Sequence, residues 1–158
     1  MIVTIASGKG GTGKTLLATG LARVVSADGS TPVYLVDCDV EEPNDHLFVR
    51  PTLTRSAEVH VLVPRVDPER CTACGRCAQV CAFHALAAVR GKVLVFPDLC
   101  HGCGSCTLQC PSQAIREEPR HLGRIEAGRA GPLHFAQGIL DVGQALATPV
   151  IHRLKQWA

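Results

Sequence analysis

The N-terminal third of the chain alternates between short apolar runs and a segment with helical spacing. Residues 2–6 (IVTIA) and 33–36 (VYLV) are mostly apolar at successive positions, which is typical of strands buried on both faces. Between them, large aliphatic residues recur at helical spacing from Leu16 to Val25, and the triplet Asp28-Gly29-Ser30 ends the pattern. The pattern predicts strand, helix and second strand, the last ending at Asp37, and therefore a parallel sheet covered by helices.

The patterning changes after residue 63, because the next segment contains eight of the nine cysteines. Within it, residues 89–96 (VRGKVLVF) predict a hairpin or strand. From about residue 119 the chain again shows a mixture of strand and helix patterns. Three further elements are expected there: a strand over 120–126, a short helix or loop over 139–147, and a helix from Pro149. We therefore expect an N-terminal part of one domain, an insert, and a return to that domain, over residues 1–63, 64–118 and 119–158.

Composition and charge argue against a nucleic-acid-binding protein and a membrane-spanning protein. Of the 158 residues, 46% are hydrophobic and 19% charged, which is ordinary for a globular chain, and the net charge of +2 is too mild to predict a nucleic-acid binder. The N-terminus lacks the features of a targeting peptide, and no apolar run approaches the roughly 18 residues of a membrane span. We expect no membrane span and a cytoplasmic location, where cysteines serve metal or redox chemistry rather than disulfides.

The cysteine segment contains an internal repeat. Residues 71–86 (CTACGRCAQVCAFHAL) and 100–115 (CHGCGSCTLQCPSQAI) both carry the spacing C-x2-C-x2-C-x3-C. Three cysteines on one tight loop can hold three corners of an iron–sulfur cube, while the fourth, at the start of a helix, reaches the other cluster. Zinc is the alternative, but zinc sites are usually built from two separated C-x2-C pairs. The repeat therefore predicts two [4Fe-4S] clusters.

Over about residues 65–117 the chain resembles bacterial-type ferredoxins that carry two [4Fe-4S] clusters. Pro111 follows the last cysteine as that pattern expects, whereas Ala82 stands where the first copy often has proline. The resemblance implies a first cluster held by Cys71, Cys74, Cys77 and Cys110. It implies a second cluster held by Cys100, Cys103, Cys106 and Cys81.

A second motif lies between the first expected strand and the helix. Residues 8–15 (GKGGTGKT) fit G-x-x-x-x-G-K-[ST], a loop whose backbone N–H groups surround a phosphate at the positive end of a helix. Lys14 would reach the β- and γ-phosphates and Thr15 would bind Mg²⁺. The expected ATP-binding residues are Gly8, Lys9, Gly10, Gly11, Thr12, Gly13, Lys14 and Thr15.

Lys9 makes the loop resemble the deviant Walker A motif of the MinD/ParA/Mrp and nitrogenase iron-protein class of ATPases. The resemblance implies that Lys9 crosses a dimer interface and contacts the nucleotide of the opposite subunit. Residues 36–44 (VDCDVEEPN) resemble the second acidic motif of that class, which implies that Asp39 orients the attacking water and that Asp37 lies near Mg²⁺. The catalytic candidates are thus Lys9, Lys14 and Asp39. Cys38 is expected to be a buried strand residue.

The two motifs together resemble MinD-type ATPases with an inserted ferredoxin domain. The implied fold is α/β, an incomplete P-loop NTPase parallel sheet with an inserted α+β ferredoxin-type domain. Such ATPases continue with a strand carrying D-x-P-P-G, and this sequence stops at Ala158 before one. We therefore expect either a fragment or half of a split protein, or else an incomplete ATP site, and we expect hydrolysis of ATP to require the missing half or a dimer. Asp141 is an alternative metal residue.

Three functions remain open from the sequence. The first is nucleotide-dependent electron transfer through the two clusters to a redox partner protein. The second is a carrier or assembly ATPase that delivers clusters to an apo iron–sulfur protein. The third is a plain electron carrier with a vestigial phosphate loop. For the nucleotide domain we expect a homodimer or pairing with a second ATPase half.

Overall fold

The computed structural model describes residues 1–157, which form two compact units. Unit 1 comprises Met1–Val59, Gly123–Val142 and the segment from Ala147, and unit 2 comprises His60–Leu122 and Gly143–Leu146. Two long strands, β2 (Thr52–Val66) and β5 (Ile115–Ala130), contribute residues to both units. The junctions at 59/60 and 122/123 therefore fall inside regular strands, close to the boundaries at 63/64 and 118/119 expected from the sequence.

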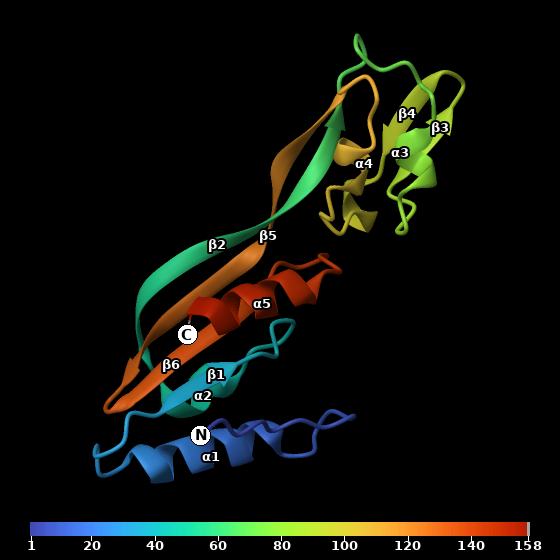
Figure 1. Cartoon of the computed structure of the whole chain (residues 1–158). Helices are drawn as coiled ribbons and strands as arrows, with labels where there is room; N and C mark the ends of the chain where they lie inside the picture. Colours follow the sequence, from blue (N-terminus) through green and yellow to red (C-terminus); the bar gives the residue numbers. More distant parts are fainter. Residues whose placement is uncertain (158) are drawn as a thin grey trace. The chain divides into compact units, whose positions relative to one another are not determined.

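The sheet of unit 1 contains both parallel and antiparallel pairs. Its strand order is β1-β6-β5-β2, with β1 at Tyr34–Asp37 and β6 at Leu133–Leu140 (Figure 1). β1 is parallel to β6, whereas β5 is antiparallel to β6. The expected α/β architecture with a parallel element is confirmed. The parallel neighbour of β1 is β6, however, and not residues 2–6.

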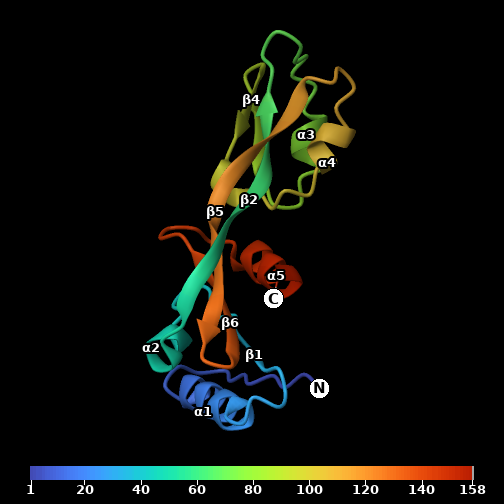
Figure 2. The same ribbon diagram turned by 90° about the vertical axis from the view of Figure 1, so that its left-hand side faces the viewer.

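Helices cover both faces of this sheet. One face packs against α1 (Lys14–Ser26) and α2 (Asp45–Val49) through a buried cluster: Ala22, Leu35, Val49, Leu133 and Phe135. The other face packs against α5 (Ala147–Trp157), where Gly138 leaves room for Val40 and Val150. Figure 2 shows α2 and α5 on opposite sides of the strands. Coverage of both faces explains why the strands carry apolar residues at successive positions.

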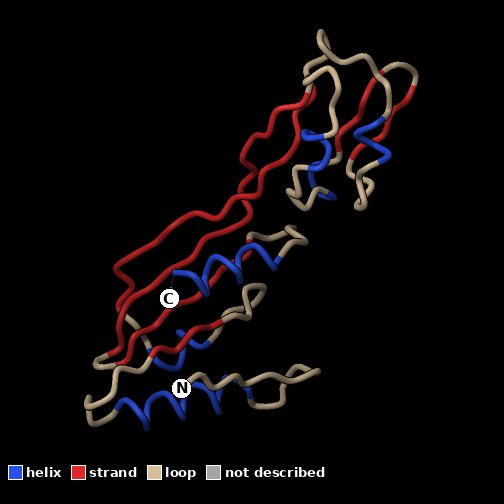
Figure 3. The backbone as a smooth tube through the Cα atoms, in the orientation of Figure 1, coloured by secondary structure: helices blue, strands red, loops and turns tan. Residues whose placement is uncertain are grey.

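The strand expected over residues 2–6 is wrong. These residues form no regular structure and appear as loop in Figure 3, and the side chain of Ile2 is 93% exposed. A strand needs a hydrogen-bonded neighbour, and residues 2–6 pair with none of the described strands, not even with the free edge of β1.

The remaining elements of unit 1 follow the sequence closely. The helix that begins at Lys14, the strand that ends at Asp37 and the C-terminal helix are confirmed. The expectation over 139–147 is partly wrong, because residues 139 and 140 complete β6 before the loop to α5 begins. No helix within residues 1–157 is both long and apolar enough to cross a bilayer.

Unit 2 is built around the cysteine repeat. The expected hairpin is confirmed as β3 (Leu86–Val89) paired antiparallel with β4 (Lys92–Val95). Two single-turn helices, α3 (Arg76–Gln79) and α4 (Ser105–Leu108), and the 3-10 turn η1 (Pro97–Leu99) complete the unit. Its core contains Ala85, Leu86 and Ile115 beside four cysteines, namely Cys77, Cys81, Cys100 and Cys106.

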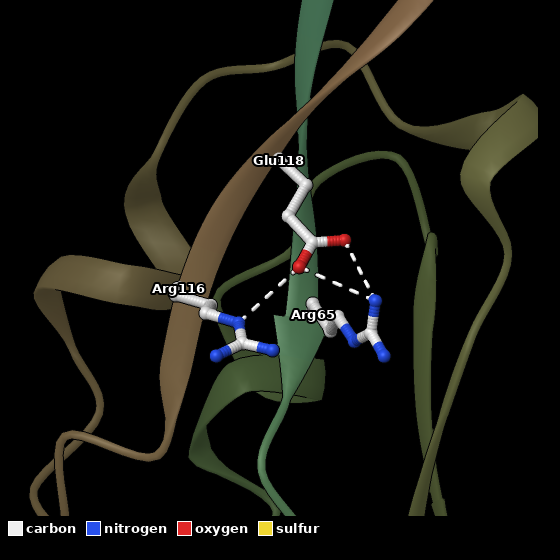
Figure 4. Close-up of polar contacts among 3 residues, drawn as sticks. All are labelled: Arg65, Arg116 and Glu118. Atoms are coloured by element: carbon white, nitrogen blue, oxygen red, sulfur yellow. Dashed lines mark hydrogen bonds and ion pairs between the residues drawn. The ribbon is translucent and has the colours of Figure 1, made fainter.

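Ion pairs add to the contact between the strands of unit 2. Glu118 accepts from Arg65 at 3.1 Å and from Arg116 at 3.2 Å (Figure 4). Arg65 comes from β2, whereas Glu118 and Arg116 lie two residues apart on β5 and therefore on the same face. The two arginine side chains are well exposed and that of Glu118 is partly exposed, so each pair contributes at most about 1 kcal/mol.

The repeat seen in the sequence is also a repeat of backbone conformation. Positive φ angles occur at equivalent positions of the two copies, in the pairs Ala73 and Gly102, Gly75 and Gly104, and His84 and Gln113. Gly75 and Gly104 immediately precede α3 and α4. The duplicated sequence therefore folds into two loops of the same shape, each followed by one helical turn.

Candidate functional site

Unit 2 contains two hollows, and each is lined by four cysteines. The first hollow is lined by Cys71, Cys74 and Cys77 of the first loop together with Cys110. The second hollow is lined by Cys100, Cys103 and Cys106 of the second loop together with Cys81. Each hollow thus combines three cysteines of one copy with the fourth cysteine of the other. These are the two groups that the resemblance to ferredoxins implies.

Backbone amides point at equivalent sulfur atoms in the two loops. The N–H of Ala73 donates to Cys71 Sγ at 3.4 Å, and that of Gly102 donates to Cys100 Sγ at 3.5 Å. Immediately before the next strand, Ala85 N donates to Cys81 Sγ at 3.2 Å and Ala114 N donates to Cys110 Sγ at 3.3 Å. Such donors stabilise negative charge on sulfur, whichever group the thiolates hold.

Burial makes some of these thiols poor acids. Burial raises the pKa of Cys77 and of Cys106, the third cysteine of each loop. Hydrogen bonding with Ser105 lowers the pKa of the exposed Cys103. For Cys110, burial raises the pKa, but hydrogen bonds with Ser112 and nearby amides outweigh it and leave the pKa lowered. A thiol with a raised pKa stays protonated unless a cation bound beside it stabilises the thiolate.

The spacing of the thiols in the four-cysteine hollows does not match the ligand set of a single metal ion. Among residues 1–157, no three Cys, His, Asp or Glu side chains converge on one point as the ligands of a single ion must. All nine cysteines are free of disulfide bonds, as expected for metal-binding thiols.

Two features distinguish the second hollow. The rings of Phe83 and His101 stack with centroids 3.7 Å apart, and both residues line the hollow. Gly102 lies directly against β2, where a Cβ atom would approach Val61 Cγ2 to 2.5 Å and the Leu62 carbonyl oxygen to 3.1 Å. With a φ of +68° as well, this position requires glycine, although the first copy has Ala73 there.

The phosphate loop of unit 1 leads directly into α1. Gly13 takes the N-cap position with a φ of 88°, and its carbonyl accepts the Leu17 N–H at 2.9 Å. Lys14 is the first residue of the helix, so Lys14 and Thr15 lie at its positive end. Ser7 and Thr12 close the loop: their hydroxyls are 2.8 Å apart, and Ser7 Oγ donates to the Lys9 carbonyl at 2.8 Å. Lys9 is exposed.

The acidic motif forms a tight loop beside Thr15. Asp37 is buried at the end of β1, and its Oδ1 accepts the Asp39 N–H at 3.0 Å. Its Oδ2 accepts the N–H groups of Asn44 and Asp45 at 3.0 and 3.1 Å. Thr15 Oγ1 donates to Asn44 Oδ1 at 2.8 Å. The structure thus brings Thr15 and the Asp37 loop together.

Three carboxylates gather in this loop. Asp45 is buried, and burial first, then the charges of Asp37 and Asp39, raise its pKa to about 6. Asp39 is exposed. Among residues 1–157 no three acidic side chains converge closely enough to hold a metal ion, so a cation here would also need oxygen ligands from a nucleotide or water.

Two residues behave differently from the sequence-based expectation. Cys38 is exposed, because β1 ends at Asp37 and the chain turns into the loop there, so the expected buried strand position is wrong. Asn44 was expected only as part of the acidic motif. The Pro43-Asn44 pair ahead of a helix was the available signal, since asparagine often begins a helix, but nothing in it indicates a bond to Thr15.

Comparison with known proteins agrees with the fold and the phosphate loop. Residues 3–153 match the CobQ/CobB/MinD/ParA nucleotide binding domain. Because the match spans most of the chain, the protein belongs to this nucleotide-binding family, and the predicted P-loop ATPase superfamily is confirmed. The chain is also similar to the uncharacterized protein MJ0578 of Methanocaldococcus jannaschii, at 35% identity over 159 residues. That alignment covers 100% of this chain and 55% of the relative, so the chain spans about half of the relative's length.

Proposed function

We propose that the protein is a nucleotide-binding iron–sulfur protein. It binds Mg²⁺-ATP at residues 8–15, carries two [4Fe-4S] clusters in unit 2, and passes electrons to a partner protein in a manner that depends on the nucleotide. The observation that carries the proposal is the pair of four-cysteine hollows in a chain of the MinD/ParA nucleotide-binding family.

The cysteine ligands proposed for the clusters are the groups that line the two hollows. Clusters bound there supply one-electron transfer. The chain itself contributes amide donors to the sulfur atoms, a buried position for Cys77 and Cys106, and the Phe83–His101 stack at the second hollow. Cys74 and Cys103 are exposed, which supports electron exchange with a partner at those corners.

The same exposure supports a second candidate function, delivery of a whole cluster to an apo iron–sulfur protein. The two candidates differ in what leaves the protein. An electron carrier reduces its partner repeatedly and keeps its iron, whereas a cluster carrier loses iron and sulfide to the acceptor in step with ATP turnover.

For the nucleotide, we propose that the loop amides and Lys14 bind the phosphates and that Thr15 holds Mg²⁺. Asp39, exposed beside this loop, is the proposed residue for orienting the attacking water. Asp37 is the proposed acid near Mg²⁺, although its two oxygens already accept three backbone N–H groups. Asp37 therefore acts through the shape of the loop at least as much as through its charge.

We further propose that additional polypeptide completes the nucleotide site, as a second ATPase half or a second copy. The exposed aliphatic side chains of α1 support this proposal, since Leu16, Leu17 and Val24 are 69%, 60% and 76% exposed. The unpaired apolar residues 2–6 support it as well.

Metal and sulfide analysis of anaerobically purified protein tests the clusters. We expect about eight iron and eight sulfide per chain, from two cubes of four irons. One or two zinc per chain without sulfide would contradict the proposal.

Substitution in the phosphate loop tests the coupling to nucleotide. We expect Lys14→Ala to abolish ATP binding and to make electron transfer to the partner independent of nucleotide. Lys92→Ala, an exposed lysine on β4, is the matched control and should change neither. If Lys14→Ala leaves a nucleotide effect on electron transfer intact, the phosphate loop is not the coupling site.

A further inference from the structure

Asn44 occupies the N-cap position of α2 but does not use its side chain as a cap. Asparagine is among the best N-cap residues because its side-chain oxygen accepts a free backbone N–H of the first turn. Here no such bond forms, and Asn44 Oδ1 accepts the hydroxyl of Thr15 at 2.8 Å. The side chain is therefore directed to the phosphate loop, 29 residues earlier in the chain.

Asp37, rather than Asn44, accepts the free backbone N–H groups at the start of α2. Its Oδ2 accepts the N–H groups of Asn44 and Asp45, and its Oδ1 accepts that of Asp39. Asp37 is buried, so these bonds fix the backbone of residues 39–45 against the end of β1. The Asn44 amide is thereby both freed from capping and held beside Thr15.

The direction of the bond matters for the chemistry of Thr15. A hydroxyl has one proton to donate and two lone pairs, and it rotates to suit its partners. Because Oδ1 is an acceptor, the Thr15 proton must point at Asn44, which leaves the lone pairs of Oγ1 for another group. A cation is the natural partner for an oxygen whose proton is already engaged.

We infer that Asn44 is a positioning residue for the Mg²⁺ of the bound nucleotide, because it holds the Thr15 hydroxyl with its lone pairs free for the cation. The inference rests on the proposed function, since it requires Mg²⁺-ATP at the phosphate loop. It makes Asn44 a determinant of metal dependence rather than of phosphate binding.

The test is equilibrium binding of ATP, measured with Mg²⁺ and with EDTA, in the whole protein and in Asn44→Ala. Alanine keeps the backbone N–H that donates to Asp37, so only the bond to Thr15 is removed. We expect the variant to lose about five- to tenfold in affinity with Mg²⁺, the size of one neutral hydrogen bond, and to match the wild type with EDTA. Asn44→Asp, which keeps an acceptor oxygen, should restore the Mg²⁺ effect.

A double-variant cycle shows whether Asn44 acts through Thr15. In a Thr15→Val background the hydroxyl is absent, so Asn44→Ala should cost nothing further. Unchanged Trp157 fluorescence and iron content verify that the variants fold.

Two outcomes overturn the inference separately from the proposed function. An equal loss of affinity with Mg²⁺ and with EDTA would make Asn44 a structural tie between α1 and α2, and an additive cycle would exclude action through Thr15. If the wild type binds no ATP under either condition, the proposed nucleotide site itself is overturned and the inference with it.

Discussion

The fourth cysteine of each hollow determines how pairs of cysteine substitutions should affect the proposed clusters. Because each hollow takes its fourth cysteine from the other copy, pairs of substitutions should behave unequally. We expect Cys74→Ser combined with Cys110→Ser to retain about four iron per chain, since both changes strike the first hollow. Cys74→Ser combined with Cys81→Ser should reduce iron to near zero, since it strikes both.

Iron and sulfide analysis distinguishes the two arrangements. If the fourth ligand came from its own copy, the two double variants would exchange their results. Cys38→Ser is the control, because this exposed cysteine lies outside both hollows and should leave the iron content unchanged.

Asp45 should make unit 1 less stable as the pH rises. Its pKa is raised from 3.8 to about 6 in the fold, so the protonated carboxyl is favoured by folding. This contribution is fully present below pH 3.8 and is lost as the pH rises through 6. With about 1.4 kcal/mol per pKa unit, the loss is about 3 kcal/mol.

The variant Asp45→Asn cannot ionise and should escape this loss. In Mg²⁺-free buffer it should match the wild type near pH 4 and exceed it in free energy of unfolding above pH 7. Urea unfolding followed by Trp157, the single tryptophan of the chain and part of α5, reports on unit 1. A difference that does not change with pH would exclude ionisation as its cause.

Residue types at fixed spacing could be identified from the sequence, whereas their hydrogen-bond partners could not. The phosphate loop and the cysteine spacings are local, so the sequence alone displays them. The bond between Thr15 and Asn44 joins residues 29 positions apart and depends on where Asp37 directs the loop. The exposure of Cys38 depends likewise on the point where β1 ends.

At the scale of elements, local patterns predicted the helix of the phosphate loop, the hairpin and the C-terminal helix. The strand over 2–6 failed because its formation depends on a neighbour, and pattern alone does not supply one. The extent of β2 and β5 was also missed. Both strands contribute residues to two units, and the face that is buried changes along their length. The regular alternation of apolar and polar residues that marks a strand in a sequence is therefore lost.

The sheet of unit 1 depends on a close approach at Gly128 of β5. A Cβ atom there would meet the Thr52 carbonyl oxygen and lie 2.8 Å from Leu53 Cα, both on β2. We expect Gly128→Ala to destabilise unit 1 by about 1–3 kcal/mol, the cost of overpacking, with the iron content unchanged.

Urea unfolding followed by Trp157 measures this effect, and Gly20→Ala is the matched control. Gly20 lies in α1 with open space around its Cα, so alanine there should stabilise by up to about 1 kcal/mol. Equal effects of the two substitutions would show that contact with β2 is not the cause.

At the scale of the whole molecule, the two lysines of the phosphate loop should have different roles. Lys14 begins α1, whereas Lys9 is exposed in the loop before it. Under the proposed function, Lys14 binds the phosphates of its own loop and Lys9 acts across an interface. The 158-residue chain by itself should bind Mg²⁺-ATP weakly and turn it over far more slowly than ~1 s⁻¹. With the polypeptide that completes the site, turnover should appear and rise steeply with protein concentration.

In that complete assembly, Lys9→Ala should lower turnover on the order of 10³-fold, as loss of an arginine finger does, with little effect on ATP affinity. Phosphate release and equilibrium binding measure the two quantities. Lys155→Ala, a change in α5, is the control and should alter neither. Fast hydrolysis by the 158-residue chain alone would mean that residues within it complete the site, and Asp141 would be the first to substitute.

Helix α1 carries its large side chains on the outside and turns Thr19, Ala22 and Ser26 inward. In a cell, chaperones and proteases bind proteins that expose an apolar surface of this kind. A copy that has not yet been covered would therefore be held or degraded, and only covered copies would accumulate. The exposed side chains of α1 would thus keep the cellular level of this chain equal to the level of the polypeptide that covers them.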